Sequence, residues 1–305
     1  MLPSFLHPFS SQDTPSAPFQ SAQFIHSGAL GSSHALWWPP RSSDSEPDAL
    51  LLFIPGNPGL ADFYIPFLSS LHEKHVSSNL AIVAHAHLDH SPAIINRVGT
   101  RYLPEHSLTI QVQSSVELLD AASRSYSGKT RIIVVGHSVG AWIALQMLKA
   151  RPNGISAVFL LFPTISNIAS TPNGKLLSPI FLPLSRSVLS SLSFLTGYLP
   201  GYFFTLLYSN WPAQQLRVLQ EFLLSSTSIT AALSMAHCEM KTIRELDSVL
   251  LGQHKQRLYF YYAPRDDWVG EERNALLRIL DPDGQSLNIV RGPSDVPHAF
   301  CISES

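Results

Sequence analysis

Charged side chains are scarce in this chain of 305 residues. Asp, Glu, Lys and Arg make up 14% of it, whereas hydrophobic residues make up 45%. A typical charged share is about 25%. The 20 basic and 22 acidic side chains give a net charge of −2. Because the basic excess of a nucleic-acid-binding protein is absent, we predict no DNA or RNA partner.

Cysteine is scarce too, and a secretory signal is missing. Cys238 and Cys301 are too few for a disulfide framework, so we expect two free thiols. The N-terminus lacks the basic start and continuous apolar stretch of a signal peptide, and its Pro and Ser content is typical of a flexible leader. We therefore expect a leader at residues 1–20 and a single domain at residues 21–305.

No metal-binding motif stands out. The densest group of possible ligands is Ala-His-Ala-His-Leu-Asp-His at residues 84–90. Its histidines alternate at the expected end of a strand and lack the HExxH spacing of a helical zinc site. We predict no metal and no cofactor.

The sequence Gly-His-Ser-Val-Gly at residues 136–140 is the most informative feature that is present. Residues 131–135 lead into it as a β-branched strand, and residues 141–149 follow with apolar side chains at helical spacing. This context is that of a nucleophile elbow, where a serine sits on a sharp turn and glycines leave room for the neighbouring strand and helix. We predict Ser138 as the nucleophile.

A nucleophilic serine needs a histidine base and an acid that orients the histidine. In this arrangement they occur along the chain in the order serine, acid, histidine. His298 lies in a short loop after the strand-like residues 286–292. His254 lies in a polar stretch before another expected strand and is the weaker candidate. We predict His298 as the base.

Two candidate acids, Asp266 and Asp267, follow the strand-like residues 257–262. Ligand-facing residues gather at such strand ends. Only one of the two can orient the histidine, and the other would cap a helix beginning near Val269. Spacing alone leaves the choice open.

A hydrolytic serine also needs N–H donors aimed at the developing oxyanion. Residues 49–54 form an apolar strand that runs into Pro55-Gly56-Asn57-Pro58-Gly59. Because Pro58 has no N–H, we predict the backbone N–H groups of Asn57 and Val139 as the donors.

Five segments resemble the lipid-droplet-associated hydrolase family, and they occur in the family's order. They are LLFIPGNPGLADFYIPFLSSL, VVGHSVGAWIALQMLK, FLLFPTISNIASTPNGKL, LYFYYAPRDDW and VPHAF. The resemblance runs from Leu50 to Phe300. It implies an α/β-hydrolase fold, in which a mostly parallel central sheet is flanked by helices. It also implies a serine esterase that acts on neutral lipid or sterol esters at lipid droplets or the endoplasmic reticulum membrane surface.

The same resemblance implies roles for particular residues. The family's triad aspartate stands two positions before a tryptophan, which corresponds to Asp266. Ala263 and Asp267 depart from the family's usual residues at their positions. The terminal helix that usually follows the histidine is missing, and the histidines of residues 84–90 are expected beside the active site.

A long hydrophobic insertion, at about residues 165–250, is expected to form a helical lid. Residues 188–216 contain no charge, and Val188–Leu207 is long enough to cross a bilayer. Pro200-Gly201 instead favours two short arms at a bend. We interpret the segment as a hairpin dipping into a lipid surface; the alternative is a buried lid over the site.

Together these features predict a serine hydrolase held at a lipid surface, with a lipid ester as its substrate. One alternative is a lipid-droplet surface protein that binds or organises and has little or no hydrolase activity. A soluble acyl transferase or peptidase on the same fold is a third possibility.

Overall fold

A single sheet organises the chain. The computed structural model describes residues 1–9, 17–28, 30–42, 44–75, 79–94, 104–281, 286, 288–293 and 295–302. Within these ranges nine strands form one sheet in the order β1-β2-β3-β5-β4-β6-β7-β8-β9. The strands are β1 His7–Pro8, β2 Gln20–Ile25, β3 Ser32–Trp38, β4 Ala49–Ile54, β5 Leu80–His85, β6 Arg131–His137, β7 Ala157–Leu161, β8 Leu258–Tyr262 and β9 Ile289–Arg291.

The sheet is mostly parallel, as predicted. All pairs from β5 through β4 to β9 are parallel, whereas β1, β2 and β3 form an antiparallel extension that joins β5. The strands predicted at residues 49–54, 131–135 and 257–262 are confirmed as β4, β6 and β8. Their carboxyl ends therefore meet at one edge, where loops can bring distant residues together.

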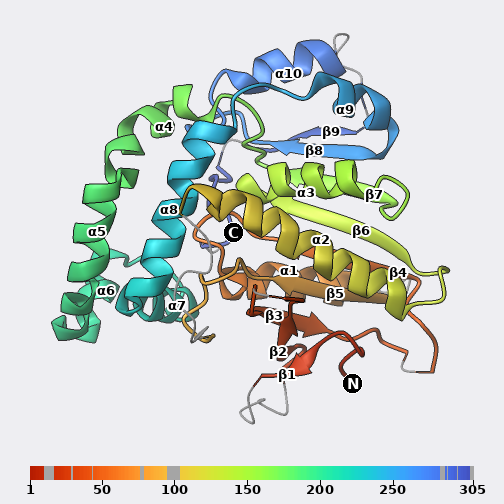
Figure 1. Ribbon diagram of the computed structural model, residues 1–305, viewed down its shortest axis with the longest axis horizontal. Coiled ribbons are helices and arrows are strands. Elements are labelled where there is room, and N and C mark those ends of the chain that lie inside the picture. The colour runs from red at the N-terminus through yellow and green to blue at the C-terminus, as the bar shows by residue number, and fades with distance from the viewer. Residues whose placement is uncertain are drawn as a thin grey trace.

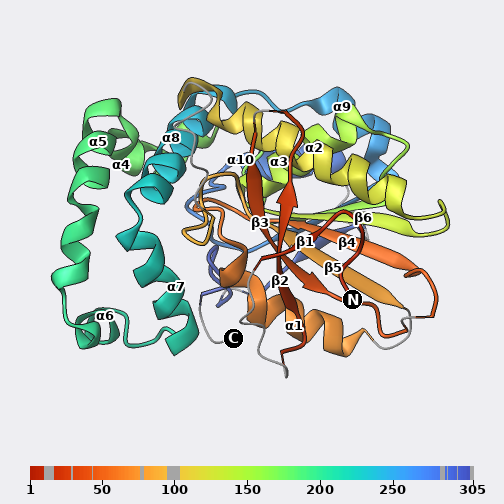
Figure 2. The same ribbon diagram turned by 60° about the horizontal axis from the view of Figure 1, so that its bottom comes forward.

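Helices cover both faces of the sheet. Figure 2 shows α2 (Ser107–Ser125) and α3 (Val139–Ala150) over one face and α1 (Ile65–Lys74) over the other. The remaining elements outside the insertion are η1 Ala61–Tyr64, η2 Pro104–His106, α9 Ser248–His254, η6 Lys255–Arg257 and α10 Glu272–Leu280.

Strand β4 shows why a fully apolar segment fits the middle of this arrangement. Leu50, Leu52 and Ile54 pack in the core under α2 and α3, whereas Leu51 and Phe53 pack in the core with α1. Successive side chains of a strand point to opposite faces, so a strand covered on both sides must be apolar throughout.

The insertion between β7 and β8 consists of helices. They are η3 Ile168–Ser170, α4 Pro172–Leu177, η4 Ser178–Phe181, α5 Pro183–Leu192, η5 Ser193–Tyr198, α6 Gly201–Leu207, α7 Ala213–Leu224 and α8 Ser226–Thr242. In both views α5 and α6 lie at the outer edge of the molecule, with α8 between α5 and the sheet (Figures 1 and 2). Helical structure stops at Tyr198 and resumes at Gly201, where the bend at Pro200-Gly201 was predicted.

The buried side chains of the segment formed by α5 and η5 are polar. They are Arg186, Ser190 and Ser193. Thirteen large apolar side chains between residues 182 and 207 are exposed, including Leu184 at 78%, Tyr198 at 80% and Leu206 at 79%. The others are Leu182, Val188, Leu189, Leu192, Phe194, Leu195, Leu199, Tyr202, Phe203 and Leu207. We call these thirteen side chains the outer apolar face. A helix on a water-covered surface has the opposite polarity.

The insertion contains one bent pair of helices with the length and apolarity of a membrane-crossing segment. Within the described ranges, no single helix has the length and apolarity needed to cross a bilayer. The pair Pro172–Phe181 and Pro183–Tyr198, bent by 72°, meets the length and composition criteria together.

The N-terminal segment differs from the flexible leader that its composition predicts. Phe5 and Leu6 are buried, and β1 pairs with β2. The ring of Phe5 meets that of Tyr126 edge-on at 6.3 Å. Residues 1–9 are thus packed because two apolar side chains reach the core, a contact that Pro and Ser content does not reveal. Residues 10–16 of the expected leader lie outside the described ranges.

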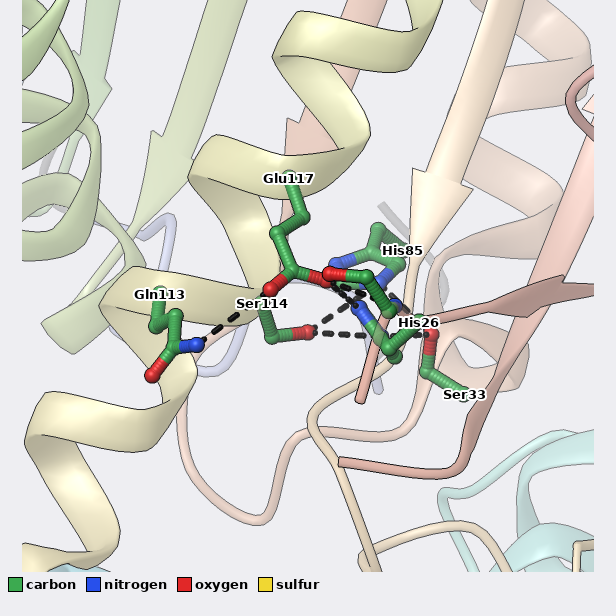
Figure 3. A network of polar contacts seen from close by, with 7 residues as sticks. His26, Ser33, His85, Gln113, Ser114 and Glu117 are labelled. Carbon is green, nitrogen blue, oxygen red and sulfur yellow. Dashed lines mark hydrogen bonds and ion pairs between the residues drawn. The ribbon is translucent and has the colours of Figure 1, made fainter. Parts of the chain in front are cut away.

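A buried network of polar side chains joins β2, β3, β5 and α2 (Figure 3). His26 lies 3.2 Å from a carboxylate oxygen of Glu117 through Nδ1, and its Nε2 lies 3.1 Å from Ser33 Oγ and 3.0 Å from Ser114 Oγ. Ser33 Oγ also lies 2.7 Å from His85 Nε2. The network satisfies polar groups that would otherwise be costly to bury.

Burial makes several histidines difficult to protonate in the folded state. It lowers the pKa of His26, and it lowers the pKa of His85, His87 and His137 well below the usual value. It lowers the pKa of His90 to about 4. The unfolded chain therefore binds more protons than the folded chain as pH falls below about 6.5.

We expect acid to destabilise the protein well before its carboxylates are protonated. Each of the five histidines should lower the free energy of unfolding as the pH falls from 6.5 to 5, because protons then bind the unfolded chain in preference to the folded one. Burial also raises the pKa of Glu239 to about 7, which works in the opposite direction but involves a single group. Calorimetry should give a clearly lower Tm at pH 5.5 than at pH 7.5. The difference should shrink in a His85→Phe variant, and equal values for the wild type would contradict the expectation.

Candidate active site

Ser138 lies on the sharp turn between β6 and α3. Its backbone angles are φ 55° and ψ −122°, a conformation that a non-glycine residue adopts at a cost. A Cβ atom at Gly140 would collide with the carbonyl oxygens of Ile54 and Pro55, and one at Gly136 would collide with the backbone of Gly140. The two glycines thus let strand, turn and helix approach closely enough to lift Ser138 out of the sheet.

The structure brings His298 and Asp266 to Ser138 in a linear arrangement. His298 Nε2 lies 2.9 Å from Ser138 Oγ, and His298 Nδ1 lies 2.7 Å from Asp266 Oδ2. An ionised carboxylate only accepts hydrogen bonds, so Nδ1 carries the ring proton and Nε2 is left to accept from the serine hydroxyl. In this state the histidine can take a proton from Ser138.

Asp266 combines the two roles that the sequence divides between neighbouring aspartates. Its Oδ1 accepts hydrogen bonds from the backbone N–H groups of Trp268 at 2.9 Å and Val269 at 3.2 Å. Asp267 is exposed, and its carbonyl oxygen accepts the N–H of Asn173. The expected helix near Val269 begins only at Glu272, and Asp266 both caps a turn and contacts His298.

The loop after β4 lies directly against the elbow. A Cβ atom at Gly56 would be 2.9 Å from Ser138 Cβ, so only glycine permits this approach. Asn57 follows on the wall of the cavity that contains Ser138. Val139 is the first residue of α3, where backbone N–H groups have no partner within the helix. Both predicted oxyanion donors therefore come from segments that flank Ser138.

A chain of hydrogen bonds connects this loop, the elbow and the histidine loop. The N–H of Gly56 donates to the Tyr64 hydroxyl at 3.0 Å, and that hydroxyl lies 2.8 Å from His137 Nδ1. His137 Nε2 lies 2.9 Å from the carbonyl oxygen of His298. Because a carbonyl only accepts, His137 must donate through Nε2 and accept from Tyr64 through Nδ1. The whole chain has one consistent set of donors.

The segment after His298 is held by packing as well. Phe300 stacks on Phe162 at 5.5 Å and meets His137 edge-on at 5.1 Å. The carbonyl oxygen of Cys301 accepts a hydrogen bond of 2.8 Å from Gln215 Nε2 of α7. These contacts anchor the histidine loop between the sheet and the insertion.

Ser138 and His298 open onto a cavity of about 610 Å³. The insertion supplies much of its wall, including Leu189 and Leu192 of α5 and Phe222 of α7. Helix α8 contributes a stripe of Ile229, Ala232, Ala236, Glu239 and Met240. Apart from a few polar groups near Ser138, the surroundings of a bound molecule are apolar.

The histidines of residues 84–90 support the site without lining this cavity. His90 Nδ1 lies 3.0 Å from the carbonyl oxygen of Pro58, and a Cβ atom at Gly59 would collide with His87 and His90. The segment thus packs behind the loop after β4. In the part of the chain that the structure describes, no group of three or more His, Cys, Asp or Glu side chains could hold a metal ion.

The network around His26 also contains a serine, a histidine and an acid in contact, but a substrate cannot reach its serines. Ser33 is 1% exposed and Ser114 is fully buried, and neither lines the cavity at Ser138. A buried serine without a substrate cavity has nothing to attack, so this network serves the packing of the sheet.

Three residues of the site have no prediction from the sequence. Tyr64 and His137 lie within the motifs, but their contacts join segments far apart along the chain. Only Glu239 could have been noticed in the sequence. It is an acid that follows Ala232 by seven residues and Ala236 by three, so it falls on the same face of a helix as small and apolar residues. Its partner Asn57 is 182 residues away.

The family model described as lipid-droplet associated hydrolase matches residues 47–301. The chain belongs to this family. It is 28% identical over 288 residues to the lipid droplet-associated hydrolase of Gallus gallus, across 88% of this chain and 85% of that one. It is 28% identical over 274 residues to the Homo sapiens protein of that name, across 85% of this chain and 81% of the relative.

Solved structures agree on the fold. A putative lipase from Acinetobacter baumannii superimposes with a TM-score of 0.61 at 18% identity, across 94% of this chain and 87% of that chain. A hydrolase from Rhodococcus sp. strain RHA1 titled 2-hydroxy-6-oxo-6-phenylhexa-2,4-dienoate hydrolase gives 0.61 at 16% identity, across 94% of both chains. The predicted α/β-hydrolase fold is confirmed, and the family places the chain among the hydrolases of that superfamily.

Removing the Tyr64 hydroxyl should destabilise the protein. A Tyr64→Phe variant leaves the N–H of Gly56 and Nδ1 of His137 buried without this partner, which should lower the free energy of unfolding by about 1–3 kcal/mol. Urea denaturation measures the change. Tyr126→Phe is the matched control, because Tyr126 is half-buried and packs on Phe5 far from the site. Equal losses in the two variants would show that the hydrogen-bond chain has no special role.

Proposed function

We propose that the protein is a serine ester hydrolase that cleaves neutral lipid or sterol esters at the surface of lipid droplets. The arrangement of Ser138, His298 and Asp266 at the wall of an apolar cavity carries the proposal. The membership of the family and the names of its relatives support it.

The chemistry follows from the donors and acceptors in place. Ser138 Oγ attacks the ester carbonyl carbon while His298 Nε2 takes the hydroxyl proton, and Asp266 stabilises the resulting imidazolium. The N–H groups of Asn57 and Val139 donate to the oxyanion. When the tetrahedral intermediate collapses, the C–O bond to the alcohol breaks and His298 returns the proton to that oxygen. Water then releases the acyl group by the same steps, and no cofactor takes part.

The walls of the cavity favour an apolar ester. Buried apolar surface contributes most of the binding free energy of such a ligand, and the volume of about 610 Å³ is that of a cleft for a molecule of moderate size. An ester with charges on the part that enters the cavity would have to leave them unpaired among apolar side chains such as Leu189, Leu192 and Phe222.

The outer apolar face supports action at a lipid surface. Its thirteen large side chains include Leu189 and Leu192, which also line the cavity. An exposed apolar patch of this kind marks an interaction site, and a lipid layer would cover it. An ester could then pass from the lipid to Ser138 along apolar side chains. The relatives are named for the lipid droplet, and we propose the droplet rather than the endoplasmic reticulum as the location.

The same outer face also fits a protein that binds or organises droplets with little or no hydrolysis. The contact between Ser138 and His298 favours the hydrolase, because a droplet-binding role does not need an aligned serine and histidine.

Replacement of the three residues should abolish hydrolysis. Ser138→Ala and His298→Ala should eliminate both labelling by a fluorophosphonate and hydrolysis of short-chain p-nitrophenyl esters. Asp266→Asn should lower kcat by a factor on the order of 10³–10⁴, because the histidine loses the acceptor for Nδ1–H. Asp267→Asn is the matched control and should retain kcat within a few-fold. Absence of labelling in the well-folded wild type would instead favour the binding role.

Polar substitutions on the outer apolar face should weaken binding to lipid. A variant combining Leu184→Ser, Phe194→Ser and Leu206→Ser should partition at least about tenfold less onto phospholipid-coated triolein droplets in a flotation assay, given about 1.5–3 kcal/mol for each large apolar side chain that is buried. Val249→Ser, a change at an exposed position of α9, should bind like the wild type. Unchanged hydrolysis of a short-chain ester would show that the triple variant is folded. Wild-type partitioning of that variant would contradict a lipid-facing role.

A further inference from the structure

The side-chain amide nitrogen of Asn57 donates both of its hydrogen bonds to α8. This Nδ2 group donates one hydrogen bond of 2.9 Å to the carbonyl oxygen of Ala232 and another of 2.8 Å to Glu239 Oε1. The two N–H bonds of the amide are thus both used. These contacts fix the position of Asn57 relative to a helix of the insertion.

The backbone N–H of Asn57 lies in the peptide plane that it shares with the carbonyl of Gly56. That carbonyl oxygen accepts the N–H of Gly59 at 2.6 Å, and the N–H of Asn57 points to the opposite side of the planar unit. One end of the plane is therefore held by the turn to Gly59. The other end, at the Cα atom of Asn57, is held by the side-chain contacts with α8 and by the backbone of Pro58, whose carbonyl oxygen contacts His90.

Glu239 is an unusual residue at its position. It is 4% exposed and lies on the cavity wall between Ala236 and Met240. An acid in such surroundings is costly to bury, so its hydrogen bond to Asn57 needs to offset part of that cost. Burial raises the pKa of Glu239 to about 7, so near neutral pH the side chain takes up a proton more readily than an exposed glutamate does. In its protonated form it accepts the hydrogen bond from Asn57 without placing a full negative charge beside a developing oxyanion.

We propose that Glu239 is a positioning residue, which holds the side chain of Asn57 so that the Asn57 backbone N–H faces the oxyanion formed at Ser138. This inference rests on the proposed hydrolase function and assigns a role within it to α8. Glu239 acts through Asn57 and does not exchange a proton with the substrate.

The decisive variants are Glu239→Met, which keeps the length of the side chain but removes the acceptor, and Glu239→Gln, which keeps a neutral oxygen acceptor. Hydrolysis of a soluble short-chain p-nitrophenyl ester should show a kcat lowered about 10- to 100-fold in Glu239→Met, since loss of one oxyanion donor costs up to 10²–10³. KM should change less than about threefold, because the donor acts on the transition state rather than the bound ester. Glu239→Gln should keep kcat within about threefold of the wild type.

A double-variant cycle separates positioning from a general structural effect. If Glu239 acts through Asn57, the variant Asn57→Ala with Glu239→Met should be no slower than Asn57→Ala alone. Lys241→Gln is the matched control at an exposed position of α8 outside the cavity wall, and its kcat should equal that of the wild type. Glu239→Ala replaces Glu239→Met if the latter does not fold.

Three results would overturn the inference. They are multiplicative losses of kcat in the double variant, an equal loss in Glu239→Gln and Glu239→Met, and an unchanged kcat in Glu239→Met. A different result would show that the protein is not a serine hydrolase. Ser138→Ala would then still hydrolyse the ester, or the wild type would not be labelled by the fluorophosphonate. Wild-type labelling at Ser138 with any of the three results would therefore reject the role of Glu239 alone.

Discussion

The hydrogen bond between His137 and the carbonyl oxygen of His298 joins two segments that are 161 residues apart, and the geometry of the site depends on it. His298 stands on a loop, where few backbone contacts fix the angle of the ring. Its side chain touches Ser138 and Asp266, while its backbone is tied to the residue beside Ser138. Ser138 and His298, the proposed nucleophile and base, are thus held by the same turn.

Local sequence predicts the parts of the site that local geometry decides. Ser138 could be predicted because the elbow requires glycine on both sides of a strand-to-helix turn, and β4 could be predicted because a strand covered on both faces must be apolar. The choice between Asp266 and Asp267 could not be made from spacing, since adjacent side chains at a strand end differ only in the direction that the turn gives them. Family resemblance supplied the candidate, and the turn after β8 directs Asp266 toward His298.

Long-range contacts account for what the sequence does not reveal. Glu239 and Asn57 are both polar and individually unremarkable in composition, and only the folding of α8 over the loop after β4 makes them partners. For the N-terminus, the sequence instead predicts less structure than the protein has. Its Pro and Ser residues are typical of a flexible leader, yet the burial of Phe5 and Leu6 is enough to order residues 1–9. Composition averages over a segment, whereas packing depends on single side chains.

The low content of charged residues in the chain is most visible in the segment of α5 and η5, whose exposed side chains are largely apolar. Arg186, Ser190 and Ser193 occupy its buried side, and the side that faces away from the protein carries Leu184, Phe194 and their neighbours. In water this polarity is unfavourable twice, because polar groups are desolvated inside while apolar surface is hydrated outside. A lipid layer removes the second cost, since the apolar side chains then leave water. The exposed apolar side chains of this segment and the apolar cavity behind it therefore fit together, because both favour contact with lipid over contact with water.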